Sequence, residues 1–84
     1  MNNLGQRIRY LREDLDIEVK QLAGYVGVHP DTLTMWERGV RPVSVDNLVK
    51  ICTALQVTPD YLLGYTTIKD APGMLALALR ETKP

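Results

Sequence analysis

The stretch Val19–Gly39, VKQLAGYVGVHPDTLTMWERG, constrains the fold of this chain more than any other part of the sequence. Its first apolar residues recur at i, i+3, i+4 and i+7, the spacing of one face of an α-helix: Val19, Leu22, Ala23 and Val26. Gly27 then ends the run, because glycine accepts a positive φ after a helix C-terminus without a Cβ clash. Pro30 suits the first turn of a second helix, which Gly39 closes. The pattern predicts a helix-turn-helix.

Part of this stretch, LAGYVGVHPDTLTMWERG, resembles the core signature of the Cro/repressor (XRE-like) helix-turn-helix family, LA..xGV(S/T)…xxWExG. The matching residues are Leu22, Ala23, Gly27, Val28, Leu33, Trp36, Glu37 and Gly39. The resemblance extends over about residues 4–64. It implies a five-helix domain that binds double-stranded DNA, with Gly27, Trp36 and Glu37 in structural roles and Pro30–Arg38 as the recognition helix.

Composition limits the classes of protein that this chain can represent. Its 84 residues allow one small domain, and its single cysteine excludes an internal disulfide. No apolar run approaches the roughly 18 residues of a membrane span, and no signal peptide opens the chain, so we expect a cytoplasmic protein. One histidine and one cysteine, far apart, provide no metal site. With no histidine–nucleophile pair and no phosphate-cradling glycine loop, we expect neither an enzyme nor a cofactor.

The charge balance is unusual for a protein that binds nucleic acid. Ten basic and ten acidic residues give a net charge of zero, whereas such proteins are expected to be basic. Long-range attraction to DNA is therefore weak. Affinity has to come from local geometry and from dimerisation.

The sequence predicts an all-α fold of five helices over residues 1–64. The first helix spans residues 4–15, with Asn2 or Asn3 as its cap and the apolar stripe Leu4, Ile8, Leu11 and Leu15. After the two helices of the central motif, Ser44 caps a fourth helix with the buried stripe Val45, Leu48, Ile51, Cys52 and Leu55. Thr58 and Pro59 begin a fifth helix that Gly64 stops. Cys52 is expected to be a core residue and not a nucleophile.

The outward face of the recognition helix supplies the candidate base contacts. With Leu33 and Trp36 turned inward, the face carries Asp31, Thr32, Thr34 and Met35. Asp31 can accept from a cytosine amino group, while Thr34 and Met35 can contact a base or a thymine methyl group. The face has none of the arginine or glutamine contacts that discriminate bases strongly.

A second set of residues is expected at the DNA backbone. We expect Thr32, Arg38 and Arg41 to contact phosphates, together with Ser44 and Asn47 at the N-terminus of the fourth helix. His29 is expected either to substitute for the usual Ser or Thr cap or to contact a phosphate. The resemblance implies that Arg12 pairs with Glu37 and also faces the DNA backbone. Glu18 and Val19 replace a capping residue and a phosphate-binding Gln of the family, so one phosphate contact is expected to be missing.

Residues 65–84 form an extension beyond the resemblance, with a short helix expected over residues 72–81. Leu75, Leu77 and Leu79 cannot share one helical face, and the extension as a whole has an apolar surplus: Ile68, Met74, Leu75, Leu77 and Leu79. Such a surplus often marks a contact surface. The segment is expected to form a symmetric homodimer or to dock a partner protein, or instead to fold back over its own core, and the sequence favours neither outcome.

Two functions follow from these observations. The first is a sequence-specific transcriptional regulator, a repressor that binds a pseudo-palindromic operator as a homodimer. The second is a protein-interaction module on the same fold, such as an antitoxin partner or an antagonist of another regulator, which the zero net charge and the apolar tail favour. A single positive surface formed by Arg12, Arg38 and Arg41 would distinguish the first from the second.

Overall fold

The computed structural model describes residues 3–65, and every regular element in that range is an α-helix. The helices are α1 (Leu4–Asp14), α2 (Val19–Val26), α3 (Pro30–Arg38), α4 (Val45–Leu55) and α5 (Pro59–Leu63). This confirms the predicted five-helix, all-α fold. No helix in the described range is long and apolar enough to cross a membrane. The predicted helix over residues 72–81 and the apolar residues of the extension lie outside the described range.

Side-chain caps fix where the first two helices begin. The Asn3 side chain accepts a hydrogen bond from the Gln6 backbone N–H at 2.8 Å, and the Gln6 side chain accepts from the Asn3 N–H at 3.1 Å. This reciprocal capping box satisfies two backbone donors that the helix leaves unpaired. At α2 the Gln21 side chain accepts from the Glu18 N–H at 2.8 Å. Gln21 therefore supplies a capping contact at the start of α2, where Glu18 replaces the usual capping residue of the family.

Left-handed glycines end the two helices of the central motif, as expected. Gly27 has φ 88° and donates its N–H to the Ala23 carbonyl at 2.8 Å, which closes α2. Gly39 has φ 76° and closes α3. A side chain at either position would strain this backbone conformation. The tight turn between α2 and α3 thus follows directly from the sequence.

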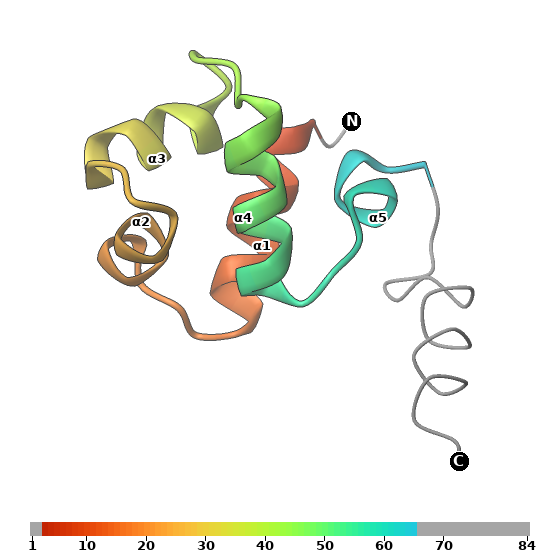
Figure 1. Cartoon of the computed structure of the whole chain (residues 1–84), viewed down its shortest axis with the longest axis horizontal. Coiled ribbons are helices and arrows are strands. Elements are labelled where there is room, and N and C mark those ends of the chain that lie inside the picture. Colours follow the sequence, from red (N-terminus) through yellow and green to blue (C-terminus); the bar gives the residue numbers. More distant parts are fainter. Residues whose placement is uncertain (1–2, 66–84) are drawn as a thin grey trace.

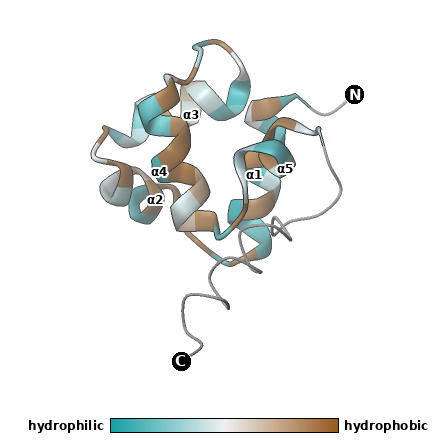
Figure 2. Ribbon diagram, turned by 45° about the vertical axis from the view of Figure 1, so that its right-hand side comes forward, coloured by the Kyte–Doolittle hydropathy of each residue, from teal (hydrophilic) through white to brown (hydrophobic). Residues whose placement is uncertain are grey.

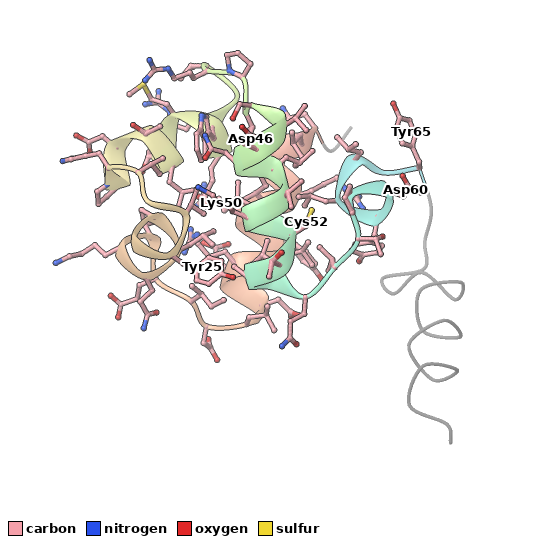
Figure 3. The ribbon with its side chains drawn as sticks, in the orientation of Figure 1. Tyr25, Asp46, Lys50, Cys52, Asp60 and Tyr65 are labelled. Carbon is pink, nitrogen blue, oxygen red and sulfur yellow. The ribbon has the colours of Figure 1, made fainter. Side chains whose placement is uncertain are left out.

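The helices form one bundle around α1 and α4. Figure 1 shows these two helices overlapping at the centre, with α2 and α3 on one side and α5 on the other. The hydropathy colours alternate along the helices in Figure 2, as expected for helices with one buried face. Each helix contributes one large, fully buried side chain to the core: Ile8, Leu22, Leu33, Ile51 and Leu62. Cys52 lies on the side of α4 that faces α5 (Figure 3) and is also buried.

Two residues of the predicted apolar stripes are not in this core. Val45 is 75% exposed and Leu15 is 47% exposed, so the expectation that they pack inward was wrong. Leu15 follows the last residue of α1 and has left the helical geometry. Val45 is the first residue of α4, and its Cα–Cβ bond points toward the open end of that helix. Helical spacing alone therefore predicts burial even at a helix end that no neighbouring helix covers.

Arg7 holds α5 against α1, a contact that the sequence did not indicate. Its Nε donates to the Leu62 carbonyl at 2.8 Å, its Nη2 donates to the Tyr61 carbonyl, and its guanidinium lies over the Tyr61 ring. A five-residue helix is not stable alone. A cation at the C-terminus of a helix interacts favourably with the helix dipole and can bind the last carbonyl groups of the helix. Arg7 does both at α5. Arg7 therefore stabilises the position from which the chain continues into residues 66–84.

Gly5 lies where α1 passes close to the backbone of α3. A Cβ atom on Gly5 would lie 2.2 Å from the Trp36 carbonyl oxygen and 2.6 Å from that of Glu37. Both are backbone atoms, which cannot move aside as a flexible side chain can. Gly24 is the opposite case, since a Cβ atom there would meet nothing within 4 Å.

These two glycines give a matched test of the packing. Gly5→Ala is expected to destabilise the fold by about 3 kcal/mol, because the methyl group forces α1 away from α3. Gly24→Ala is expected to stabilise it by about 1 kcal/mol, because alanine favours the helix interior. Chemical unfolding followed by circular dichroism measures both changes. Equal stability of the two variants would contradict the close approach of α1 and α3.

Candidate nucleic-acid interface

The central feature of the candidate interface is the outward face of α3. Leu33 and Trp36 are buried, with 0% and 4% exposure, and this fixes the rotation of the helix about its axis. Asp31 and Thr34 are consequently exposed, while Met35 is half-buried. The side chains predicted to contact bases therefore lie on the solvent side of α3, outside the core.

His29 caps α3, which confirms one of the two roles expected for it. It precedes the first residue, Pro30, and its Nδ1 accepts a hydrogen bond from the Asp31 N–H at 3.1 Å. The imidazole thus takes the place of the Ser or Thr oxygen that usually accepts this bond. Its side chain is 71% exposed, so most of the ring faces solvent at the start of α3.

A buried ion pair joins α3 to α1. Arg12 Nε lies 2.7 Å from Glu37 Oε2, and Arg12 Nη2 lies 3.1 Å from Glu37 Oε1, a two-point contact. The two side chains are only 10% and 6% exposed. The hydrogen bond to Glu37 raises the pKa of the Arg12 guanidinium above its ordinary value, although burial opposes the shift. The pair implied by the resemblance is confirmed.

Arg12 also binds a third segment of the chain. Its Nη1 donates to the Ile17 carbonyl at 2.9 Å. One guanidinium therefore links α1, the connection before α2, and α3. This bond could not be predicted from the sequence, because a backbone carbonyl in an irregular connection leaves no residue pattern.

The connection between α3 and α4 extends the interface beyond the end of α3. Arg38 and Arg41 are both exposed there, as is Val40 at 63%. Ser44 Oγ accepts from the Asn47 N–H at 3.3 Å and so caps α4. This bond occupies the Asn47 amide. The amides of Val45 and Asp46 are the remaining donors of that first turn.

The structure distributes the predicted contact residues unevenly. The exposed ones are His29, Asp31, Thr34, Arg38, Arg41 and Ser44. The half-buried ones are Thr32, Met35 and Asn47. Arg12 is buried and paired with Glu37, so the expected single positive surface of Arg12, Arg38 and Arg41 does not form, and the exposed arginines near the end of α3 are Arg38 and Arg41. The phosphate contact implied for Arg12 stays a prediction.

The described residues hold no group of three or more His, Cys, Asp or Glu side chains placed to bind a metal ion. Burial raises the pKa of the Cys52 thiol, which keeps it protonated. An uncharged, buried thiol suits the predicted core role.

Comparison with known proteins agrees with this architecture. The helix-turn-helix family HTH_3 matches residues 8–62. Repressor protein C2 of Salmonella phage P22 is 40% identical over 60 residues, which are 71% of this chain and 28% of that protein. Control protein C.BamHI of Bacillus amyloliquefaciens is 40% identical over 65 residues, 76% of this chain and 80% of that protein.

A solved structure is similar as well. The crystal structure of the P22 c2 repressor in complex with synthetic operator 9T has a TM-score of 0.73 and 36% identity, and covers 79% of this chain and all of that one. The chain belongs to the helix-turn-helix family of Cro and phage repressors. It spans less than a third of the length of the P22 repressor protein that it matches.

The buried pair makes the position of α3 sensitive to one carboxylate. Glu37→Gln is expected to destabilise the fold by about 3 kcal/mol, because it leaves the buried Arg12 charge without its counter-charge. Thermal unfolding monitored by circular dichroism gives the change.

The exposed pair of Arg9 and Glu13, with Nε and Oε2 3.3 Å apart on α1, provides the control. Glu13→Gln removes an identical charge from a solvated pair and is expected to cost under about 0.5 kcal/mol. A Glu37→Gln loss no greater than that of Glu13→Gln would show that the buried pair does not hold α3.

Proposed function

We propose that this chain is a sequence-specific DNA-binding transcriptional regulator that inserts α3 into the major groove. The observation that carries the proposal is the exposed face of α3. The ion pair of Arg12 and Glu37 holds this helix against α1, with that face toward solvent. The first half of α3 is the part that reads base edges in this motif. The related phage protein is a repressor whose structure was solved with a synthetic operator. We propose that this chain is also a repressor and that it acts in the cytoplasm.

Base contacts are assigned to Asp31, Thr34 and Met35. The Asp31 carboxylate accepts from a cytosine amino group, and Met35 contacts a thymine methyl group. Thr34 hydrogen-bonds a base or contacts a thymine methyl group. Asp31 is unfavourable near any sequence that lacks its cytosine, because it then repels the phosphates. It therefore contributes to specificity more than to affinity.

Phosphate contacts are assigned to side chains around this face. Arg38 and Arg41 supply the ionic contacts, and Arg12 orients α3 from within. Hydrogen bonds to phosphates are assigned to His29, Thr32, Ser44 and Asn47. Few ionic contacts predict a shallow dependence of affinity on salt concentration.

A homodimer on a pseudo-palindromic operator completes the proposal. Residues 1–64 form the DNA-binding domain, and residues 65–84 form the dimer contact or a docking segment for a partner protein. A two-fold dimer places its two α3 helices about 34 Å apart, one turn of DNA. Two weakly charged domains then combine their contacts on one duplex.

Selection of duplexes from random sequence tests the DNA-binding proposal. We expect enrichment of a two-fold-symmetric sequence. Thr34→Ala should reduce the preference at one base position by up to about 1 kcal/mol, the lower end of the range for a bidentate pair, because threonine makes only a single contact. Arg41→Ala should lower the salt slope of log Kd by about 0.9, the effect of one lost phosphate contact.

Two variants away from α3 serve as controls for that experiment. Thr53→Ala removes an exposed hydroxyl that bonds its own helix at the Val49 carbonyl, and Arg9→Ala removes one exposed positive charge from α1. Both should bind the selected duplex like the parent chain. Absence of any enriched sequence, with only weak retention at low salt, would refute the proposal.

Sedimentation of the full chain tests the proposed dimer. Leu77→Glu should convert the dimer to a monomer and weaken binding to the two-half-site duplex, because it places a charge in an apolar contact. Thr82→Glu adds the same charge nearby and should leave the dimer intact. A Leu77→Glu variant that sediments like the parent would place the two-fold contact elsewhere.

A further inference from the structure

A hollow between α2 and the C-terminal half of α4 takes no part in the proposed DNA contacts. Its volume is about 370 Å³. Figure 3 shows Tyr25 between α2 and this half of α4. The side chains that line the hollow are all uncharged: Ile17, Gln21, Leu22, Tyr25, Thr53 and Ala54. An occupant therefore has to be uncharged and largely apolar, because a charge would lose its water without finding a partner there.

The outer face of α4 continues this apolar surface. Val45, Val49 and Thr53 are spaced four residues apart, so they share one face of the helix. The two valines are 75% and 52% exposed, and Tyr25 on α2 is 58% exposed. An apolar stripe on a helix normally faces another element. Within residues 3–65 the valine stripe is left open to solvent.

We propose that residues 74–79 of a second copy of this chain occupy the hollow, so that each chain of the dimer inserts its extension between α2 and α4 of the other. The inference rests on the proposed homodimer and names the surface that receives the extension.

The extension has the composition that the hollow requires. Residues 71–79, APGMLALAL, carry no charged side chain, and charged residues flank them on both sides. Leucine side chains are of a size to fill an apolar hollow, and the alanines between them allow close approach of the backbone. Insertion of this segment therefore removes apolar surface from water on both partners without burying a charge.

The place where the extension starts favours the second copy over the same chain. Residue 65 follows α5, and α2 and α5 lie on opposite sides of α1 and α4 in Figure 1. The extension would have to cross the outer face of α4 to reach its own hollow. Rotation by 180° about the vertical axis of Figure 1 exchanges the α2 and α5 sides and keeps α3 in the upper part. In such a pair the end of α5 lies beside the hollow of the other copy, and both α3 helices stay on one side.

Two-fold symmetry also supplies enough contact area. A two-fold dimer repeats each contact, so two extensions and two hollows are buried together. Stable interfaces bury at least about 1,200 Å² in total. One short segment in one hollow is small on that scale, and the second, equivalent contact doubles the buried surface.

Paramagnetic broadening in mixed samples tests the exchange of extensions without DNA. A spin label is attached to Thr82→Cys in full-length chains that lack ¹⁵N. Burial raises the pKa of the Cys52 thiol, which keeps that thiol from reacting with the label. After exchange of subunits with ¹⁵N-labelled parent chains, we expect broadening of the parent amide signals at Gln21, Tyr25 and Ala54.

Two other results of this measurement would overturn the inference. Broadening of these signals only where label and ¹⁵N are on the same chain would mean that the extension folds back over its own bundle. Broadening in the mixed sample centred on Tyr10 and Leu11, which line a separate hollow of about 120 Å³ between α1 and α5, would place the contact there.

A matched pair of tyrosine variants tests the same contact by sedimentation. Tyr25→Glu places a carboxylate at the hollow and should raise the dimer dissociation constant by about tenfold or more, because the charge loses its water on association. Tyr10→Glu makes the same change on α1, at a side chain that is 67% exposed, and should leave the dimer unchanged. Circular dichroism of both variants should match the parent, since both tyrosines lie outside the core.

The comparison with Leu77→Glu separates this inference from the proposals on which it rests. Dissociation by Leu77→Glu but not by Tyr25→Glu would refute the hollow as the receiving surface and leave the proposed dimer standing. A dimer that neither variant weakens would refute both. Neither result depends on DNA, so the proposed base and phosphate contacts are tested independently.

Discussion

The two-point contact between Arg12 and Glu37 is the interaction on which the arrangement of this molecule depends. The glycine-ended turn specifies that α2 and α3 are consecutive, but it does not specify how α3 lies on the rest of the bundle. The burial of Leu33 and Trp36 sets the rotation of α3, and one guanidinium that binds Glu37 and the Ile17 carbonyl at once ties the helix to α1 and to the connection before α2. Gly5 permits it, since any side chain at Gly5 would separate α1 from α3. A buried ion pair adds little net stability, and its contribution here is geometric.

Much of the fold could be predicted from the sequence because its signals are local. Apolar spacing, proline at helix starts and glycine at helix ends each act within a few residues, and they placed all five helices correctly. The errors arose where the outcome depended on packing between helices, which a local sequence pattern does not contain. Val45 and Leu15 continue apolar stripes but lie at helix ends with no neighbour to cover them. Arg7 was missed because its partners, Tyr61 and Leu62, lie more than fifty residues away.

The candidate site was predictable in part. The outward positions of α3 follow from the burial of Leu33 and Trp36, and the cap role of His29 follows from its place before Pro30. Which ring nitrogen of His29 accepts the Asp31 N–H could not be predicted, because it depends on how the ring is oriented at the cap. The burial of Arg12 was also not evident, since an arginine in a sequence carries no indication of its exposure. The proposed DNA-facing surface exposes the two arginines Arg38 and Arg41, so under the proposal geometry and dimerisation supply the affinity that charge does not.

The most direct test of this account is nuclear magnetic resonance of the full-length protein during titration with its selected operator. The account predicts that backbone amide signals change at residues 29–35 of α3 and its cap and at residues 38–47 of the following connection. Signals of residues 13–18 and of α5 should change little. A response centred instead on the hollow of about 370 Å³ lined by Ile17, Tyr25 and Thr53 would contradict it. In Figure 3, Tyr25 projects from α2 toward the C-terminal half of α4, away from α3.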